Sequence, residues 1–118
     1  DELNFNIDIV AGNTVREHDG LAMSSRNTHL TPDQRASAKH LFASLEHVKT
    51  HFTPEEVSSL EASARLNLEA AGMVIEYFSI RDAANLQPVN NNTIEIVVLV
   101  AAWLGETRLI DNILFPMP

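Results

Sequence analysis

The most apolar stretch of this sequence reads TIEIVVLVAAW, from Thr93 to Trp103. Its residues are β-branched or aliphatic at both odd and even positions for much of its length. That pattern is typical of a central strand that is buried on both faces. We therefore predict a strand over this stretch at the middle of a sheet, with Trp103 in the core.

Two further strands are predicted before and after this stretch. From Val74 to Ile80 the sequence changes to a period of two, which indicates a strand. Arg108 to Phe115 offers a third. The segment from Asp82 to Asn92 is rich in turn residues and is predicted to connect the first strand to the central one. Together the three strands predict a small antiparallel sheet.

Two amphipathic helices are predicted before the sheet. Thr31-Pro32-Asp33-Gln34 combines a hydroxyl N-cap, a proline at the first helical position and a glutamine placed to close a capping box, so a helix should run from here to about Lys49. Thr53-Pro54-Glu55-Glu56 repeats this signal, and Gly72 should end the second helix. Each helix carries an apolar stripe, formed by Ala38, Leu41, Phe42, Leu45 and Val48 in the first and by Val57, Leu60, Ala64, Leu68 and Ala71 in the second.

The chain is predicted to fall into two parts that meet near Thr28 to Thr31. Residues 29–118 form an α+β domain, in which the helix pair packs on the three-stranded antiparallel sheet. Asn6 to Val10 alternates polar and apolar residues and is predicted to be a strand. Since one strand cannot form a domain, residues 1–28 look like the tail of a preceding α/β domain. The chain begins with Asp1 rather than methionine, so we expect it to be a piece of a longer protein.

Composition and charge narrow the classes of function. The 118 residues are 45% hydrophobic and 20% charged, as in ordinary globular domains. A formal net charge of -8 at pH 7 would repel a nucleic-acid backbone, so no nucleic-acid partner is expected. The absence of cysteine fits the cytoplasm. The longest apolar run, Ile96 to Leu104, is too short to span a bilayer, so we expect no membrane association.

A polar loop before the first helix concentrates hydrogen-bond donors. Ser24, Ser25 and Arg26 bring two hydroxyls and a guanidinium together after a glycine that could act as a hinge. These groups suit a triphosphate, because a guanidinium binds phosphate oxygens as a planar fork and hydroxyls bind the remaining oxygens. The alternative is a solvated surface loop in which Arg26 pairs with Glu17 or Asp19.

Two separated strings in this sequence resemble the pantothenate synthetase (pantoate:β-alanine ligase) family. The first reads TVREHDGLAMSSRN, from Thr14 to Asn27. The second reads VVLVAAWLG, from Val97 to Gly105, followed by TRLIDN, from Thr107 to Asn112. They occur in the family's order, and the resemblance extends over essentially the entire chain. The chain is similar to the C-terminal part of such a ligase.

The resemblance implies an activity and a set of site residues. The family joins pantoate and β-alanine to form pantothenate in a reaction that uses ATP and Mg²⁺, passes through pantoyl adenylate and releases AMP and pyrophosphate. It implies that Met23, Ser24, Ser25 and Arg26 bind ATP in a mobile lid loop, with the backbone of Val15 at the adenine. Residues 1–28 would end a Rossmann-like nucleotidyltransferase domain, and residues 29–118 would be a C-terminal domain that closes over it.

The same resemblance implies what this chain lacks. The family's proton donor lies in a His-x-Gly-His motif, which does not occur in this sequence. The pantoate and β-alanine pockets lie in the same missing N-terminal domain. We therefore expect no catalytic residue in this chain and no activity from it alone. The whole enzyme is expected to be a cytoplasmic homodimer that serves the coenzyme A pathway.

Three histidines could in principle hold a metal ion. His40 and His47 lie on the first predicted helix and His51 lies just past its end, one helical turn after His47. Solvated surface histidines are the preferred interpretation, because neither cysteine nor a His-Glu-x-x-His frame accompanies them.

Charged residues at the strand ends are interpreted as structural. Arg81-Asp82 and Arg108 with Asp111 and Asn112 could be catalytic, but such charges commonly pair with one another or cap turns. One function of another class stays open for the whole chain. The helix pair and the apolar sheet could form a non-catalytic module that dimerises or docks on a partner.

Overall fold

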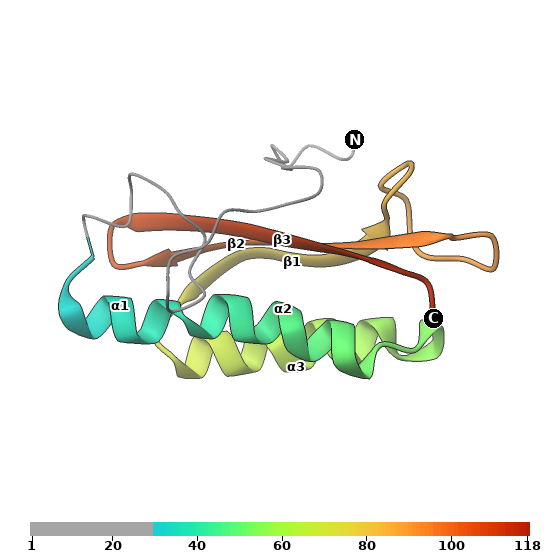
Figure 1. The fold of residues 1–118 in the computed structure, drawn as a ribbon. Helices are drawn as coiled ribbons and strands as arrows, with labels where there is room; N and C mark the ends of the chain where they lie inside the picture. The colour runs from blue at the N-terminus through green and yellow to red at the C-terminus, as the bar shows by residue number, and fades with distance from the viewer. Residues whose placement is uncertain (1–29) are drawn as a thin grey trace.

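The computed structural model describes residues 30–118 and shows a helical layer on one face of a three-stranded sheet (Figure 1). The elements in chain order are α1 (Pro32–Ala38), α2 (His40–His51), the 3₁₀ turn η2 (Pro54–Glu56), α3 (Val57–Ala70), β1 (Val74–Asp82), β2 (Glu95–Leu104) and β3 (Thr107–Pro116). This architecture confirms the predicted α+β class. The strand predicted over Asn6–Val10 and the proposed division at residue 28 lie outside the described residues.

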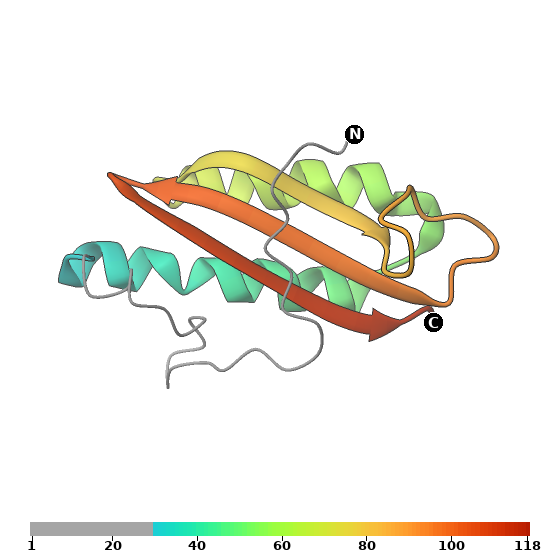
Figure 2. The ribbon, with the colours of Figure 1, turned by 90° about the horizontal axis from the view of Figure 1, so that it is seen from above.

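The sheet is an antiparallel meander with β2 at its centre, as the apolar stretch predicts. Seven of the ten β2 residues are buried in one unbroken run, Ile96 to Ala102. The β1–β2 register shifts between Ile75 and Tyr77, so Glu76 is the extra residue of a β-bulge. In Figure 2, which views the sheet side, α3 lies beneath β1 and α2 lies on the side of β3.

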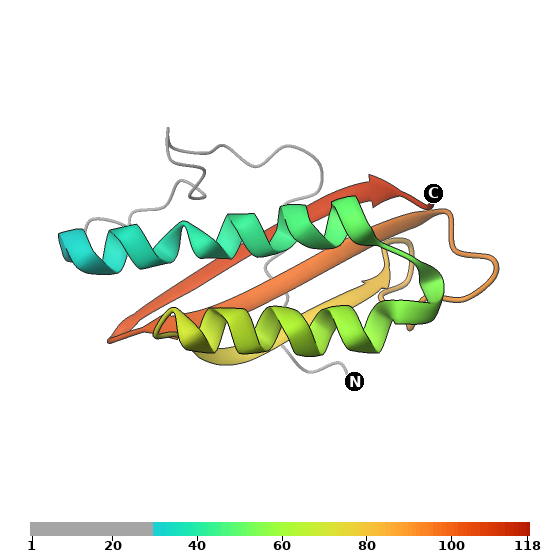
Figure 3. The same cartoon turned by 90° about the horizontal axis from the view of Figure 1, so that it is seen from below.

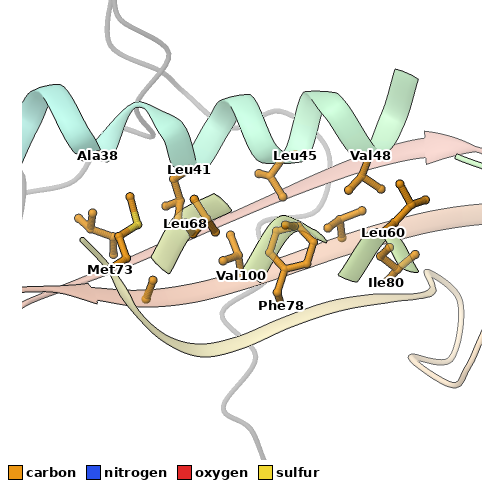
Figure 4. Close-up of a cluster of buried hydrophobic side chains, with 14 of the residues drawn as sticks. Ala38, Leu41, Leu45, Val48, Leu60, Leu68, Met73, Phe78, Ile80 and Val100 are labelled. Carbon is orange, nitrogen blue, oxygen red and sulfur yellow. The ribbon is translucent and has the colours of Figure 1, made fainter. Parts of the chain in front are cut away.

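The main core fills the space between the helices and the sheet (Figure 4). The predicted stripe of the first helix is largely confirmed, because Ala38, Leu41, Leu45 and Val48 are all fully buried. They pack with α3 and with the helix-facing residues of the strands, which include Phe78 and Val100.

The sheet face away from the helices also carries apolar residues. Its buried members are Tyr77, Val97, Leu99 and Ala101, with Ala83, Leu86, Ile110 and Leu114 packed against them. The prediction that Trp103 belongs to the core is wrong. Its side chain is 39% exposed, because it lies on this face next to the hairpin end of the sheet, beyond the apolar cluster.

The first predicted helix is divided by a break at Lys39. The backbone of Lys39 stays close to helical angles, with φ of -67° and ψ of -14°, so α1 and α2 continue in nearly the same direction (Figure 3). The sequence has neither glycine nor proline at this point to mark the interruption. None of the described helices has both the length and the hydropathy to cross a membrane.

The second predicted helix begins differently from the first. Thr53 makes no side-chain cap, and the first turn is the 3₁₀ turn η2. The Glu56 N–H donates to the Thr53 backbone carbonyl over 3.0 Å instead of to the threonine hydroxyl. The helix ends as predicted at Gly72, which has a φ of +97°, a left-handed conformation that favours glycine.

Candidate functional site

The residues predicted to bind ATP all precede the part of the chain that the structure describes. They are Val15, Met23, Ser24, Ser25 and Arg26, and their role stays a prediction. The described part of the chain begins at Leu30, just before α1. The Leu30 side chain is partly buried against the main core.

The predicted capping box at the start of α1 is confirmed. The Gln34 N–H donates to Thr31 Oγ1 over 3.1 Å, and the Thr31 N–H donates to Gln34 Oε1 over 3.0 Å. Two backbone N–H groups that the helix start leaves without a helical partner are thereby satisfied. The side chain of Gln34 is therefore held in one orientation.

The hairpin between β2 and β3 lies against this helix start. Leu104 pairs with Thr107, so the turn consists of Gly105 and Glu106. Gly105 has a φ of +61°, the left-handed conformation that two-residue hairpin turns favour at their first position. A Cβ atom at Gly105 would lie 2.8 Å from Gln34 Nε2. The hairpin turn and the capping box thus meet at the start of α1.

A polar cluster occupies the hairpin end of the sheet, on the face away from the helices. Arg108 donates to Glu76 through Nε over 2.9 Å to Oε1 and through Nη2 over 3.3 Å to Oε2. The Trp103 indole N–H donates to Glu76 Oε1 over 3.3 Å. The cluster therefore joins all three strands, and it confirms that Arg108 is a paired strand-end charge.

Glu76 is the member of this cluster that the sequence reasoning did not single out. The hydrogen bond from Arg108 is the main cause that lowers the pKa of Glu76 below its ordinary value, and the Arg108 charge and the Trp103 hydrogen bond add to it. Partial burial acts in the opposite direction. A lone carboxylate within an apolar strand was the available signal, but its partners depend on the strand register and the bulge.

Asp82 organises the turn after β1. Its Oδ2 accepts the Thr93 hydroxyl over 2.9 Å, and its Oδ1 accepts the Ala84 N–H over 2.8 Å. Thr93 Oγ1 in turn accepts the Asn90 N–H over 2.9 Å. Asp82 and Thr93 are both buried, which confirms the prediction that this strand-end charge caps a turn.

Asp111 and Asn112 are buried neighbours in the middle of β3. Asp111 pairs with Val100 and Asn112 with Leu99, so their side chains lie on opposite faces of the sheet. Asp111 Oδ1 accepts the Asn112 N–H over 2.8 Å. Asp111 thus also accepts a hydrogen bond from the backbone of its own strand.

The histidines of α2 interact with one another. The rings of His47 and His51 stack with their centroids 4.2 Å apart, and His51 Nδ1 lies 3.0 Å from the His47 carbonyl oxygen. Within residues 30–118, no three histidine, aspartate or glutamate side chains come together as metal ligands.

Three surface hollows of 320, 370 and 290 Å³ lie on the described domain. The first contains Glu61 and Arg81, the second His40 and His47, and the third Asp82. Among the described residues that line these hollows, no hollow has more than one arginine or lysine. They therefore do not provide the clustered positive charge that a triphosphate site requires.

Comparison with known proteins also includes the residues before Leu30, which the structure does not describe. The family model of pantoate-beta-alanine ligase matches residues 1–114 of the chain. The chain belongs to the pantoate-beta-alanine ligase family. The match includes both strings that suggest this family in the sequence, from Thr14 to Asn27 and from Val97 to Asn112.

Curated relatives from this family are pantothenate synthetases. That of Thiobacillus denitrificans is 46% identical over 114 residues, which cover 95% of this chain and 40% of the relative. That of Nitrosomonas europaea is 41% identical over 120 residues, which cover 100% of this chain and 43% of the relative. The chain therefore spans about 40% of the length of the curated relatives it matches.

Solved structures of family members share the fold. A pantothenate synthetase of Thermus thermophilus matches with a TM-score of 0.72 and 31% identity, over 95% of this chain and 41% of that one. The pantoate-beta-alanine ligase of Francisella tularensis, complexed with beta-gamma ATP and beta-alanine, matches with a TM-score of 0.53 and 25% identity, over 86% of this chain and 31% of that one.

Proposed function

We propose that this chain is the C-terminal part of an enzyme that ligates pantoate and β-alanine to pantothenate with ATP. The observation that carries the proposal is the family match over residues 1–114, together with relatives that are named pantothenate synthetases. The structure of a Francisella tularensis relative with an ATP compound and β-alanine supports these substrate classes.

The proposed division of labour follows the chain. Residues 1–28 end a nucleotide-binding domain and carry the lid loop, and residues 29–118 form the domain that closes over the site. The proposed loop precedes Leu30 in the sequence, and the Leu30 side chain packs against the main core of the described domain. The pantoate and β-alanine pockets and the general acid belong to the remainder of the enzyme, so this chain alone is expected to be inactive.

Ser24, Ser25 and Arg26 are proposed to bind the β- and γ-phosphates of ATP. Together with the backbone N–H groups of the loop, which includes Met23, they offer hydroxyls and one guanidinium for the phosphate oxygens. The backbone of Val15 would contact the adenine. Donors fixed in this way stabilise the negative charge that grows on the departing pyrophosphate.

The reaction then takes place in two steps. A carboxylate oxygen of pantoate attacks the α-phosphorus, the bond to the β-phosphate oxygen breaks, and pyrophosphate leaves with the electron pair. The amine of β-alanine next attacks the acyl carbon of pantoyl adenylate, loses a proton, and displaces AMP to form the amide. The loop residues act in the first step, because only that step separates the bound pyrophosphate from the rest of ATP.

ATP is proposed to enter as its Mg²⁺ complex, since Mg²⁺ prefers phosphate oxygens and water to sites built entirely of protein groups. The whole enzyme is further proposed to be a cytoplasmic homodimer. Light scattering on the full-length enzyme tests this assembly, and a monomeric mass would contradict it.

The function is tested by product analysis of the full-length enzyme. Pantoate, β-alanine and MgATP should together yield pantothenate, AMP and pyrophosphate, and omission of any one substrate should abolish pantothenate. An enzyme that releases ADP and phosphate instead would contradict the adenylate route. If no pantothenate forms, and ATP affinity is indifferent to alanine at Ser24, Ser25 and Arg26, the alternative of a non-catalytic interaction module is favoured.

A further inference from the structure

We propose that His47 and His51 form a binding site for a divalent transition-metal ion, with Cu²⁺ as the ion bound most tightly. The site lies at the C-terminal end of α2, in the helical layer of the described domain (Figure 3). It is independent of the ligase function proposed above. For these two residues it replaces the interpretation as solvated surface histidines, which His40 keeps.

The two imidazole rings lie close enough to share one ion. Because they are one helical turn apart, they occupy the same face of α2. Their centroids are 4.2 Å apart, with an angle of 28° between the ring planes. A bond from Zn²⁺ to a histidine nitrogen is about 2.0–2.1 Å long, so two ring nitrogens bound to one such ion are roughly 3 Å apart. A small rotation of the side chains is sufficient to bring one nitrogen of each ring to this separation.

A hydrogen bond determines which nitrogen of His51 is available to a metal. Its Nδ1 lies 3.0 Å from the backbone carbonyl oxygen of His47. A carbonyl oxygen only accepts hydrogen bonds, so Nδ1 carries the proton, and Nε2 of the neutral ring keeps its lone pair for the ion. Histidine ligands characteristically donate their other N–H in this way, which fixes the tautomer and the orientation of the ring. The spacing in the sequence does not show this bond.

The chemistry of the pair selects the class of ion. Imidazole nitrogen suits Cu²⁺, Ni²⁺ and Zn²⁺, whereas Mg²⁺ and Ca²⁺ prefer oxygen ligands. Among the divalent ions of the first transition row, Cu²⁺ has the highest affinity for a given set of nitrogen ligands. Within residues 30–118 no third histidine or carboxylate joins the pair. Water can supply the remaining ligands, because His47 lines an open surface hollow of 370 Å³.

The chain provides a matched control in His40. This residue lies on α2 and lines the same hollow as His47, but it precedes His47 by two helical turns. Side chains on one face of a helix are direct neighbours only at spacings of three and four residues. The substitution His40→Gln therefore removes an imidazole from the same helix and leaves the proposed pair intact.

The test measures the affinity of the full-length enzyme for Cu²⁺ by titration calorimetry, in the wild type and in three variants. Loss of a hydrogen-bond partner of a metal ligand costs about 10–100-fold in affinity, so loss of a ligand in His47→Gln or His51→Gln should weaken binding by about tenfold or more. His47→Gln keeps the backbone carbonyl that His51 contacts, so its effect reports the lost ligand alone. His40→Gln should keep the wild-type affinity, and circular dichroism checks that every variant keeps its helices.

Electron paramagnetic resonance of the Cu²⁺ complex identifies the ligands directly. The wild-type enzyme with equimolar Cu²⁺ should show two imidazole nitrogens on the ion, and so should His40→Gln. This two-nitrogen signal should disappear in His47→Gln and in His51→Gln. An excess of Mg²⁺ should not displace the Cu²⁺, because the pair offers no oxygen ligands.

Three outcomes would overturn the proposal. The first is a wild-type affinity for Cu²⁺ in either His47→Gln or His51→Gln. The second is an equal loss of affinity in His40→Gln and His47→Gln, which would show that the ion is not held by the stacked pair. The third is a wild-type spectrum that is unchanged by removal of either member of the pair. Since Cu²⁺ binding is measured without pantoate, β-alanine or ATP, failure of the proposed ligase function would leave this inference standing.

Discussion

Substitution of Gly105 by alanine tests whether the hairpin turn and the capping box are physically coupled. Alanine at a φ of +61° adopts a left-handed conformation, which costs about 1–2 kcal/mol. The new Cβ would also lie 2.8 Å from Gln34 Nε2, so the end of the glutamine side chain must shift, and we expect the hydrogen bond from the Thr31 N–H to its Oε1 to break. Loss of this one hydrogen bond costs about 1 kcal/mol, and the two costs sum to roughly 2–3 kcal/mol. Gly105→Ala should lower the free energy of unfolding by this amount.

A double-mutant cycle separates the two contributions. In a Gln34→Ala background no glutamine amide is present to displace, so Gly105→Ala should cost only the backbone term of about 1–2 kcal/mol. The coupling between the two sites should therefore be about 1 kcal/mol. Urea unfolding can be followed by circular dichroism and by the fluorescence of Trp103, the single tryptophan, which lies two residues before Gly105. Equal costs of Gly105→Ala in both backgrounds would refute the coupling.

Three further substitutions test the packing and polar contacts of the described domain by the free energy of unfolding. Leu45→Ala should lower it by about 2–5 kcal/mol, since the side chain is fully buried between the helices and the sheet, and a smaller loss would contradict close packing there. Thr93→Val should cost about 1–3 kcal/mol because the buried Asp82 carboxylate loses a donor, and a neutral effect would argue against this bond. Glu76→Gln should cost less than about 1 kcal/mol at pH 7, since its pair with Arg108 is partly exposed. Because the pKa of Glu76 is lowered on folding, its contribution is present above the ordinary glutamate pKa and is lost as the pH falls through the lower folded value, so a difference that persists in acid would contradict the pairing.

An element of the fold could be predicted from the sequence where its hydrophobic pattern is compatible with only one kind of element. The stretch from Thr93 to Trp103 is apolar on both faces, and only a central strand buries both. The prediction for Trp103 was wrong because hydrophobic periodicity does not reveal where along a strand the neighbouring side chains stop burying it. The division at Lys39 left no trace in the sequence, since a residue that keeps helical angles needs no glycine or proline.

The two Thr-Pro starts show why a local pattern is insufficient. Both have a threonine followed three residues later by Gln34 or Glu56, yet only Thr31 forms the capping box. At Thr53 a 3₁₀ turn uses the N–H that the threonine hydroxyl would otherwise accept. The two threonines differ in backbone conformation, with φ of -71° at Thr31 and -136° at Thr53, and the shared sequence pattern does not specify this difference.

The candidate ATP site stays a prediction from a motif, because its residues lie outside the described part of the chain. Two hydroxyls next to an arginine are only a weak indication of a phosphate-binding site. The resemblance of the surrounding string, from Thr14 to Asn27, to the ligase family made the prediction specific. The contact between Gln34 and Gly105 lies outside the reach of motif reasoning. It joins residues 71 positions apart in the sequence and depends on a hairpin turn that folds back against the first helix.

The central claim is that Arg26 serves the adenylation step. It is tested most directly by two half-reactions of the full-length enzyme with Arg26→Ala, with Arg65→Ala on α3 as the control. Pantoate-dependent ATP–pyrophosphate exchange should fall about 100-fold in Arg26→Ala, because one donor to the developing charge is lost. Amide formation from preformed pantoyl adenylate and β-alanine should keep its wild-type rate, and Arg65→Ala should leave both unchanged. Normal exchange with slowed amide formation in Arg26→Ala would contradict the account.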